Sequence, residues 1–479
     1  MARAPWFAAG PGAWWAMLGH LRPPDPTVPT PAEDWRHAVV DVVIPVCRHH
    51  DTVVHCLASL LGQTRLPRRV LLVDDGGIDR DHSLQLAREF ARANGIRLET
   101  IARGWSIGRV VTLKRQSREF EGDVLLVLDA DAVLESPDYI ERCICELYQG
   151  VGIASASGRM LPLQESARER LETSAPFRNW LGDDDYAHRQ RPDNRWQTAL
   201  QRMSQGYHAH MAVLQQDFLD AGVSRVDGGV PIGSGGAVAY RRRYLRDLFH
   251  RYEPIRGDDF TALEDHFIAL ALMNAGYRNI RVPDVVARTR APSLLRLPEH
   301  SRRWSAGFLQ LHHYFDVLLR SPLRRLRMPG RARREDAAQW RRGKAERRVQ
   351  EPYRQGFGER ITRESGRPLG TPLALIALER IGYPVLLWVL TLAGQWTALA
   401  IVVALEVLAT CFIAARFASG PRLRAALQAL AWAPVRYLLI LQEPIALGWF
   451  AIRRWWKRDL DWHVRRDARG RRRPRAIRH

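Results

Sequence analysis

The stretch Val124-Leu125-Leu126-Val127-Leu128-Asp129-Ala130-Asp131 decides the fold that the sequence predicts. Its five apolar residues follow the turn signal Glu121-Gly122-Asp123, and such an uninterrupted run is typical of a strand buried on both faces of a parallel sheet. The chain then leaves the sheet at its carboxyl edge, where open α/β sheets bind ligands. Two carboxylates there supply hard oxygen ligands for Mg²⁺ or Mn²⁺, which can hold the phosphates of a nucleotide. An ordinary acidic loop has the same pattern, so the flanking sequence must show whether the two aspartates form a ligand site.

Strands and helices alternate around this stretch. The predicted strands cover 39–46, 70–73, 96–101, 124–128 and 151–157. Helical spacing of apolar residues predicts helices over 51–63, from about Leu84 to the stop signal Asn94-Gly95, over 109–120, and from Ser136-Pro137 to about Tyr148. This order predicts an α/β fold with a parallel, doubly wound sheet. The usual Gly-x-Gly-x-x-Gly loop is missing after the first strand, which argues against a dinucleotide oxidoreductase.

The second half of this region is less regular. Residues 160–227 are polar and helical in places, and they lead to the Gly-rich loop 228–236. Such a loop suits close approach of the backbone to a ligand, although it could equally be a tight connection. A helix is predicted over 262–275, ending at Gly276, and a strand over 279–283.

Size and charge narrow the class of protein. The chain has 479 residues, of which 46% are apolar and 26% charged, so it is long enough for more than one domain and is not disordered as a whole. Its formal net charge of +21 suggests nucleic acid, phosphorylated substrates or anionic lipid as partners. Much of the excess lies in 302–368 and 453–478, on either side of an apolar stretch, which favours a membrane surface. The five cysteines show no zinc-site spacing, so we expect reduced thiols on the cytoplasmic side.

Two apolar stretches, 373–394 and 397–415, are each long enough to cross about 30 Å of hydrocarbon. They predict a membrane hairpin, although Glu379, Arg380 and Glu406 are costly in a bilayer. The alternative is a pair of buried helices in a soluble domain.

A third apolar region, 425–452, carries Arg436 and Glu443 and is broken by Pro434 and Pro444. We expect it to be re-entrant, interfacial or a short hairpin, because a single crossing would place the basic tail outside, against the positive-inside rule.

The N-terminal segment 1–35 combines a short Trp-rich apolar piece with a Pro-rich linker. It lacks the basic start and cleavage site of a secretory signal. An interfacial membrane anchor and a segment that docks on the rest of the chain both fit its composition.

Five short segments together resemble a known family. They are the two opening strands with Val43-Ile44-Pro45-Val46 and Val73-Asp74-Asp75-Gly76, then Asp129-Ala130-Asp131, Leu263-Glu264-Asp265 and His300-Ser301-Arg302-Arg303-Trp304. In this order they resemble family 2 glycosyltransferases with the GT-A fold, and especially the membrane-associated synthases of cellulose, chitin and hyaluronan. The resemblance covers roughly residues 39–320.

The resemblance implies a role for each motif. Asp265 matches the catalytic base, and Asp129 and Asp131 match the ligands of Mg²⁺ or Mn²⁺. The residues that match a nucleotide-sugar site are Pro45, Asp74, Asp75, Lys114, Asp129, Glu264, His300, Arg303 and Trp304. Arg303 would pair with the diphosphate and Trp304 would stack on the acceptor sugar. Lys114 could equally be an exposed helix lysine.

Three positions depart from the family pattern. His300 stands for the usual Gln, Leu263 for the usual Thr, and Cys47 for a frequent aromatic residue near uracil. These changes bear on substrate identity and processivity more than on the fold.

We therefore expect an inverting, metal-dependent glycosyltransferase on the cytoplasmic face of the inner membrane. It would move a sugar from a UDP-sugar to a growing glycan or a lipid-linked acceptor, by polymer synthesis or by single addition, with help from a partner subunit or oligomer. The expected parts are an N-terminal interfacial segment and linker (1–38), the GT-A domain (39–320), a basic juxtamembrane region (321–370), hydrophobic helices (371–452) and a basic cytoplasmic tail (453–479).

Two other classes of function compete with this one. One is a basic, membrane-bound binding protein with a degenerate transferase fold, which His300 and Leu263 would suit. The other is a nucleic-acid protein, suggested by the arginines of 323–348. No nucleic-acid module accompanies those arginines, so we expect no nucleic acid as partner and favour membrane lipid.

Overall fold

The structure is a computed structural model of the chain. It describes residues 7–22, 34–46, 52–74, 82–103, 109–149, 152–180, 195–231, 233, 235–256, 263–327 and 370–456. Asp75 and Cys47, for which the sequence predicts roles, lie outside these residues. For Glu264 and Arg303 only the backbone is described.

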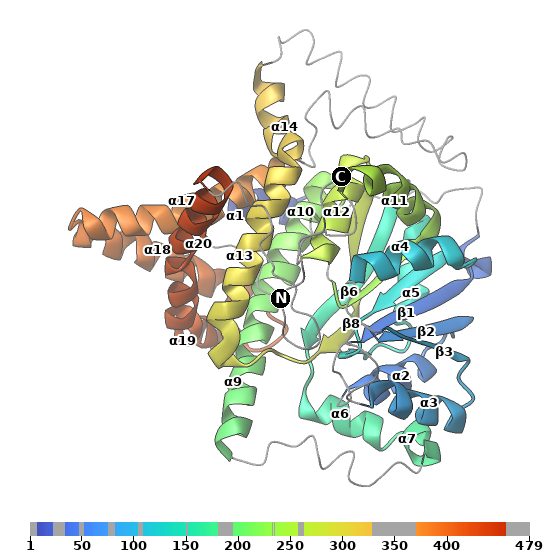
Figure 1. Cartoon of the computed structure of the whole chain (residues 1–479). Helices are drawn as coiled ribbons and strands as arrows, with labels where there is room; N and C mark the ends of the chain where they lie inside the picture. Colours follow the sequence, from blue (N-terminus) through green and yellow to red (C-terminus); the bar gives the residue numbers. More distant parts are fainter. Residues whose placement is uncertain are drawn as a thin grey trace.

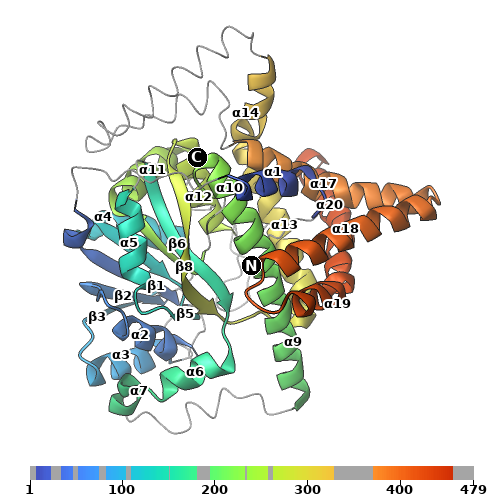
Figure 2. The same ribbon diagram turned by 180° about the vertical axis from the view of Figure 1, so that it is seen from behind.

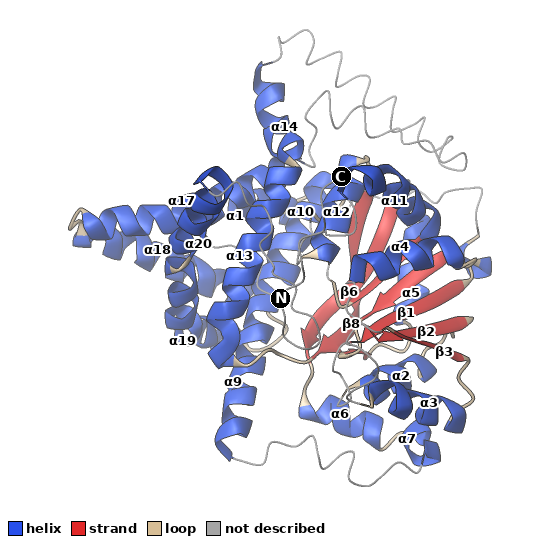
Figure 3. Cartoon of the chain, viewed as in Figure 1, coloured by secondary structure: helices blue, strands red, loops and turns tan. Residues whose placement is uncertain are grey.

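A mixed, eight-stranded sheet forms the centre of the molecule, with helices on both faces (Figure 3). Its order is β3-β2-β1-β4-β7-β6-β8-β5. The strands are β1 (Val40–Val46), β2 (Arg69–Asp74), β3 (Leu98–Ala102), β4 (Val124–Leu128), β5 (Ala132–Leu134), β6 (Ile153–Pro162), β7 (Ala237–Arg241) and β8 (Arg278–Thr289). The predicted α/β fold is confirmed, and strands β3, β2, β1 and β4 run parallel as expected.

Strand β7 pairs antiparallel with both β4 and β6, so the sheet is not parallel throughout. The Gly-rich loop explains this direction. It lies at the carboxyl edge of β4, where the N–H of Asp129 donates to the carbonyl oxygen of Gly236 at 2.8 Å. Strand β7 starts at that edge and must therefore run back across the sheet.

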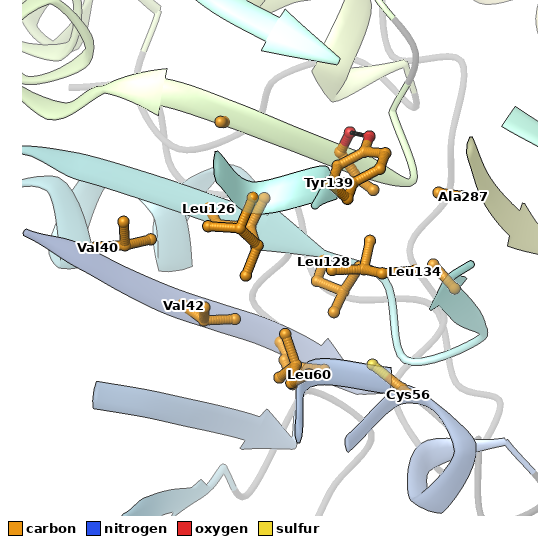
Figure 4. Packing of buried hydrophobic residues seen from close by; sticks show 14 of the residues in the cluster. Val40, Val42, Cys56, Leu60, Leu126, Leu128, Leu134, Tyr139 and Ala287 are labelled. Carbon is orange, nitrogen blue, oxygen red and sulfur yellow. Dashed lines mark hydrogen bonds between the residues drawn. The ribbon is translucent and has the colours of Figure 1, made fainter. Parts of the chain in front are cut away.

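The alternation of side chains along β1 and β4 builds two cores. Val42, Ile44, Leu126 and Leu128 belong to the core on one face, which helices α2, α3 and α5 cover. Figure 4 shows Val42, Leu126 and Leu128 in this core, together with Leu60 of α2 and Tyr139 of α5. Their neighbours Val43, Leu125 and Val127 belong to the core on the other face, beneath α4, α11 and α12. Strand β4 is therefore buried on both faces, as the apolar run predicted.

Helices surround the sheet and extend beyond it (Figures 1 and 2). Those of the sheet domain are α2 (Val53–Leu61), α3 (Ser83–Ala93), α4 (Arg109–Glu119), α5 (Tyr139–Gln149), α6 (Glu165–Glu172), α7 (Ala175–Trp180), α9 (Arg195–Ala212), α10 (Ala221–Asp227), α11 (Arg242–Arg256), α12 (Glu264–Asn274), α13 (Leu297–Tyr314) and α14 (Asp316–Arg327). A π-helical segment, Val213–Asp220, joins α9 to α10.

Four apolar helices follow: α17 (Gly370–Leu392), α18 (Trp396–Phe417), α19 (Arg422–Leu441) and α20 (Glu443–Ala451). Helices α17 and α18 are long and apolar enough to cross a membrane, and they extend together away from the sheet in both views (Figures 1 and 2). Large side chains along α18 are exposed, among them Leu405 at 57% and Leu408 at 66%. This exposure does not suit buried helices of a soluble domain and is consistent with membrane association.

The charged side chains that are buried within the apolar region have polar partners. Arg436 of α19 lies 2.5 Å from Glu406 of α18, and Arg380 of α17 lies 3.2 Å from Glu443 of α20. Glu379 accepts a hydrogen bond from the N–H of Gly12. Each charge thus joins two elements of the bundle instead of facing outward.

The prediction that Pro434 breaks the third apolar region is wrong, because α19 continues through it. The break falls at Gln442, and Pro444 lies in the first turn of α20, where its missing N–H costs no helical hydrogen bond.

The N-terminal helix α1 (Pro11–His20) docks on the rest of the chain. It packs against α10 and α17, and the backbones approach so closely that a side chain at Gly19 would overlap the carbonyl group of Gly222. The indole N–H of Trp15 donates to Asp227 of α10 at 2.9 Å. Of the two interpretations of this segment, the structure shows the docked one for residues 11–20.

Candidate active site

The carboxylate pair lies in a tight turn at the carboxyl edge of the sheet. Strand β4 ends at Leu128, and the N–H of Ala132 donates to the carbonyl oxygen of Asp129 at 2.9 Å, which turns the chain into β5. The side chains of Asp129 and Asp131 are both partly exposed. The turn therefore presents two carboxylates to ligands at the edge where the sequence predicts a site.

Arg109 contacts Asp129, and the sequence did not predict this contact. Its guanidinium lies 2.8 Å from Asp129 Oδ1 and donates to the carbonyl oxygen of Gly235 at 2.7 Å. Arg109 is the first residue of α4, where a cation opposes the helix dipole. This unfavourable placement is the signal that could have drawn attention to it.

Thr289 contacts Asp131, and it too was missed. Its hydroxyl donates to Asp131 Oδ2 at 3.0 Å, because Thr289 pairs with Ala132 between β8 and β5. The sequence predicted that this strand ends at Pro283, which is wrong: β8 continues to Thr289. Pro283 lies where the register with β6 shifts, between the pairs Ser157–Arg281 and Arg159–Val286, so its missing N–H interrupts no ladder pair.

Asp265 lies on another element, next to the Gly-rich loop that also contacts Asp129. It is the second residue of α12, and its carboxylate lies so close to Gly235 that any side chain there would overlap it. A side chain at the next residue, Gly236, would begin 3.7 Å from Asp129 Oδ2. The Gly-rich loop therefore lies against both the predicted base and the predicted metal ligand, and at Gly235 a Cβ would not fit unless Asp265 moved.

Two buried groups lie close to these carboxylates. Burial raises the pKa of Tyr240 in β7; Arg109 lowers it, while Asp265 and Asp129 raise it further. Burial likewise raises the pKa of the Cys56 thiol well above its usual range, and the charges of Asp131 and Asp129 add to the effect. Both groups therefore stay protonated, and neither suits the role of a nucleophile.

The predicted nucleotide residues lie on neighbouring elements. Asp74 ends β2, is 4% exposed and pairs in register with Val46, while Pro45 pairs with Val73. Lys114 is half-buried on α4, five residues after Arg109. That offset is about 140° around a helix, so Lys114 leaves α4 on a different face from Arg109.

His300 and Trp304 lie one turn apart on α13, with ring centroids separated by 5.8 Å. Trp304 packs against the same core as Leu263, and Gly307 of α13 contacts Leu263 directly. Leu263 immediately precedes α12. Helix α13 thus packs on the start of the helix that carries Asp265, and Leu263 fills an apolar position there.

The donor set at the sheet edge suits a hard divalent cation. Asp129 and Asp131 provide carboxylate oxygens, and Mg²⁺ commonly combines one or two protein carboxylates with substrate phosphates. Within the described residues, no three His, Cys, Asp or Glu side chains form a complete metal site. The two aspartates therefore fit a metal that a nucleotide diphosphate helps to hold.

Comparison with known proteins identifies the sheet domain. Residues 41–249 match the model of the family described as glycosyl transferase family 2. This part of the chain is a family 2 glycosyltransferase domain. The predicted family and the GT-A fold class are thereby confirmed, but a closer relation to the cellulose, chitin or hyaluronan synthases is not.

The glycosyltransferase domain has relatives among rhizobial enzymes. The N-acetylglucosaminyltransferase of Mesorhizobium japonicum is 27% identical over 275 residues, which are 57% of this chain and 55% of the relative. That of Bradyrhizobium diazoefficiens is 26% identical over 261 residues, 54% of this chain and 46% of the relative. The chain thus spans about half the length of these relatives.

Among solved structures, a mannosyltransferase from Pyrobaculum calidifontis in complex with GDP-mannose and Mn²⁺ is similar, with 17% sequence identity and a TM-score of 0.47. The similarity covers 93% of this chain and 94% of that one.

Proposed function

We propose that the protein is an inverting, metal-dependent glycosyltransferase that moves a sugar from a UDP-sugar to a glycan or lipid-linked acceptor. The observation that carries this proposal is the convergence of Asp129 and Asp265 on the loop at Gly235-Gly236, with Asp131 in the same turn as Asp129. Because the relatives are named N-acetylglucosaminyltransferases, UDP-N-acetylglucosamine is the first donor to test.

The residues divide the chemistry between them. Asp265 would take the proton of the acceptor hydroxyl as that oxygen attacks, and a single displacement inverts the anomeric centre. Asp129 and Asp131 would hold Mg²⁺ or Mn²⁺, which when bound stabilises the negative charge of the leaving diphosphate. Arg109 fixes Asp129, and Thr289 fixes Asp131. Asp74, Asp75 and Pro45 would contact the nucleoside, Arg303 the diphosphate and Trp304 the acceptor sugar, with Lys114, Glu264 and His300 completing the site.

We place the enzyme at the cytoplasmic face of a membrane, with the domain limits expected from the sequence. The exposed apolar side chains of α17 and α18 support this placement. Arginine-rich segments on either side of the apolar helices suit anionic lipid on the cytoplasmic side.

The test is release of UDP from a panel of UDP-sugars by purified protein in lipid, with and without Mn²⁺ or Mg²⁺. We expect metal-dependent release with one sugar and none with Asp265→Asn, which keeps the shape of the side chain but not its basicity. The alternative is a degenerate binding protein, to which Leu263 and His300 give some weight. UDP binding that does not depend on Mn²⁺ or Mg²⁺, together with no UDP release from any donor, would favour the binding protein.

A further inference from the structure

The π-helical segment Val213–Asp220 is held between the sheet and the apolar helices. In Figures 1 and 2, helices α9 and α10, which this segment joins, pass between the sheet and α18. On the side of α18, the ring of Phe218 packs against that of Phe417, with centroids 5.1 Å apart. On the other side, polar side chains of the segment bind strands of the sheet. π-Helical turns are rare and occur frequently at functional sites.

Gln216 of this segment takes the place of a neighbouring strand beside β6. Among the described residues, β7 pairs with β6 only at Ser155 and Ala156, so the edge of β6 that faces β7 has no strand partner at Met160. Instead, the N–H of Met160 donates to Gln216 Oε1 at 2.9 Å, and Gln216 Nε2 donates to the carbonyl oxygen of Met160 at 2.8 Å. A side-chain amide has the donor and the acceptor of a peptide group, so it can bind a strand in this way.

The amide of Gln216 is itself oriented by a buried ion pair. Arg281 of β8 donates from Nη1 to Gln216 Oε1 at 2.9 Å and from Nη2 to Asp220 Oδ2 at 2.8 Å. Only 7% of the Arg281 side chain and 9% of the Asp220 side chain are exposed. Because a guanidinium can only donate hydrogen bonds, the oxygen of the Gln216 amide must face Arg281. The amide nitrogen is then left to donate to Met160.

Met160 carries this constraint to the Gly-rich loop. A Cβ at Gly236 would lie 2.7 Å from Met160 Cε and 3.7 Å from Asp129 Oδ2. The carbonyl oxygen of Gly236 also accepts the hydrogen bond from the N–H of Asp129 at 2.8 Å. The methyl group of Met160 therefore packs on the loop residue whose carbonyl group binds Asp129.

We propose that Gln216 is a positioning residue for the candidate active site. By fixing Met160 against Gly236, it holds the Gly-rich loop where that loop binds the N–H of Asp129, and so keeps the Asp129 carboxylate in place for a metal and a nucleotide diphosphate. The proposal rests on the proposed glycosyltransferase function and adds to it a residue outside the motifs of the sequence.

The experiment combines two measurements on the full-length protein in lipid nanodiscs. Hydrogen exchange, followed by mass spectrometry of peptides that cover residues 127–131, reports on the N–H of Asp129. Calorimetry gives the affinity for UDP with Mn²⁺. Gln216→Met keeps the length of the side chain but forms neither hydrogen bond to the Met160 backbone. We expect it to speed exchange at Asp129 and to weaken UDP binding, each about three- to tenfold, the value of roughly one hydrogen bond.

Two further variants test the two steps of the path. Gln216→Glu still accepts from Arg281 and from the N–H of Met160 but cannot donate to the Met160 carbonyl, so its effects should have the same direction and be smaller. Met160→Ala leaves Gln216 intact and removes the contact with Gly236, and it should weaken UDP binding as Gln216→Met does. The double variant should bind no more weakly than the weaker of the two single variants, because both act through one contact.

Asp217→Asn is the matched control. Asp217 links the same two elements, since its carboxylate accepts from Arg159 Nη2 at 2.7 Å. Arg159 precedes Met160 in β6, so its side chain points to the opposite face of the strand, away from Gly236. Asp217→Asn should lower the unfolding temperature without changing exchange at Asp129 or the affinity for UDP.

Unchanged exchange at Asp129 in both Gln216 variants, or an equal change in Asp217→Asn, would overturn the positioning role. Faster exchange with unchanged UDP affinity would overturn it too, because the loop would then not support the donor site. Failure of the proposed function differs from these results: the parent protein would bind no UDP or bind it without Mn²⁺, while exchange at Asp129 would still decide whether Gln216 holds the loop.

Discussion

At the scale of single residues, the geometry depends on glycine at 235. A methyl group there would overlap the carboxylate of Asp265, so Gly235→Ala must displace the base or the loop. Because small misplacements at a reacting centre cost about a hundredfold in rate, we expect kcat for UDP release to fall by at least that factor. The thermal unfolding temperature, measured beside it, should change little.

Gly233→Ala provides the control within the same loop. Among the described residues, a Cβ at Gly233 would have no neighbour within 4 Å, so kcat should stay near that of the parent protein. Equal losses in the two variants would show that the loop tolerates no alanine anywhere, and the placement of Asp265 would no longer explain the result.

Thr289 belongs to the same scale, because it acts on a single carboxylate. Thr289→Val keeps the shape of the side chain but removes the hydrogen bond to Asp131 Oδ2. Loss of a group that orients a metal ligand commonly weakens metal binding about ten- to a hundredfold. The Mn²⁺ concentration for half-maximal UDP release should rise accordingly, with the KM for the donor much less affected. An unchanged Mn²⁺ requirement would argue against Asp131 as a metal ligand.

The sequence predicted the acidic residues of the site but not their partners. Asp129 and Asp131 were visible because they follow an apolar run that is typical of a buried strand, whereas Asp265 was assigned through the resemblance of Leu263-Glu264-Asp265 to a family motif. Arg109 and Thr289 reach the site only through tertiary pairing: α4 lies beside the Gly-rich loop, and β8 pairs with β5. Neither relation has a local pattern in the sequence.

At the scale of elements, the docking of α1 should depend on pH. Burial raises the pKa of Asp227 in α10 to about 7, against which the hydrogen bond from Trp15 and the charge of Arg22 act to lower it. The folded protein therefore holds this proton more tightly than the unfolded chain, and stability falls as pH rises from about 4 to 7. The shift from the ordinary value of 3.8 sets an upper limit of about 4 kcal/mol.

Asp227→Asn should remove this dependence, because an amide stays neutral and still accepts the hydrogen bond from Trp15. The variant should unfold at a higher temperature than the parent at pH 8 and at nearly the same temperature at pH 4.5. Trp15→Phe, which leaves the carboxylate buried without that partner, should be less stable than the parent at pH 8. Parallel pH profiles for Asp227→Asn and the parent would refute the assignment.

The buried ion pair between α17 and α20 should hold α13 as well. Ser305 of α13 donates to Glu443 Oε1 at 2.5 Å and accepts from Arg380 at 3.1 Å. Glu443→Ala leaves Arg380 buried without its counter-charge, which typically costs about 3–5 kcal/mol. The double variant Arg380→Met with Glu443→Leu removes both charges and should recover most of that stability in thermal unfolding in detergent. A double variant no more stable than the single one would show that the charges do not act as a pair.

The helices and strands were predicted correctly where the spacing of apolar residues and the residue composition of a segment indicate the same element. The alternation from β1 to α5 follows from apolar runs and stop signals, whereas the direction of β7 depends on where the Gly-rich loop lies in space. Pro283 and Pro434 misled the prediction for different reasons. A helix can continue through an interior proline at the loss of one hydrogen bond, as α19 does at Pro434. A proline ends a strand only where its missing N–H would have been paired. At Pro283 a register shift removes that cost.

At the scale of the whole molecule, the apolar helices and the sheet domain form one packed body. Helix α13 joins them, since Ser305 contacts the pair Arg380–Glu443 on one side and Gly307 contacts Leu263, next to α12, on the other. The orientation of the helices in a membrane would therefore fix the orientation of Asp265 and the carboxylate pair. A hairpin of α17 and α18 that crosses the bilayer has its turn at Gln395 on the side opposite the sheet domain.

This topology can be read by chemical labelling of single added cysteines. Gln395 is exposed at the start of α18, and Glu121, with 87% of its side chain exposed, lies on the sheet domain. We expect Gln395→Cys to react with a membrane-impermeant maleimide in intact expression cells, and Glu121→Cys to react only after the cells are opened. The parent protein sets the background from the native cysteines, of which Cys56 and Cys143 are buried. Reaction of both variants only after lysis would mean that the hairpin does not cross. Reaction of Glu121→Cys in intact cells would place the sheet domain outside, away from any cytoplasmic nucleotide-sugar.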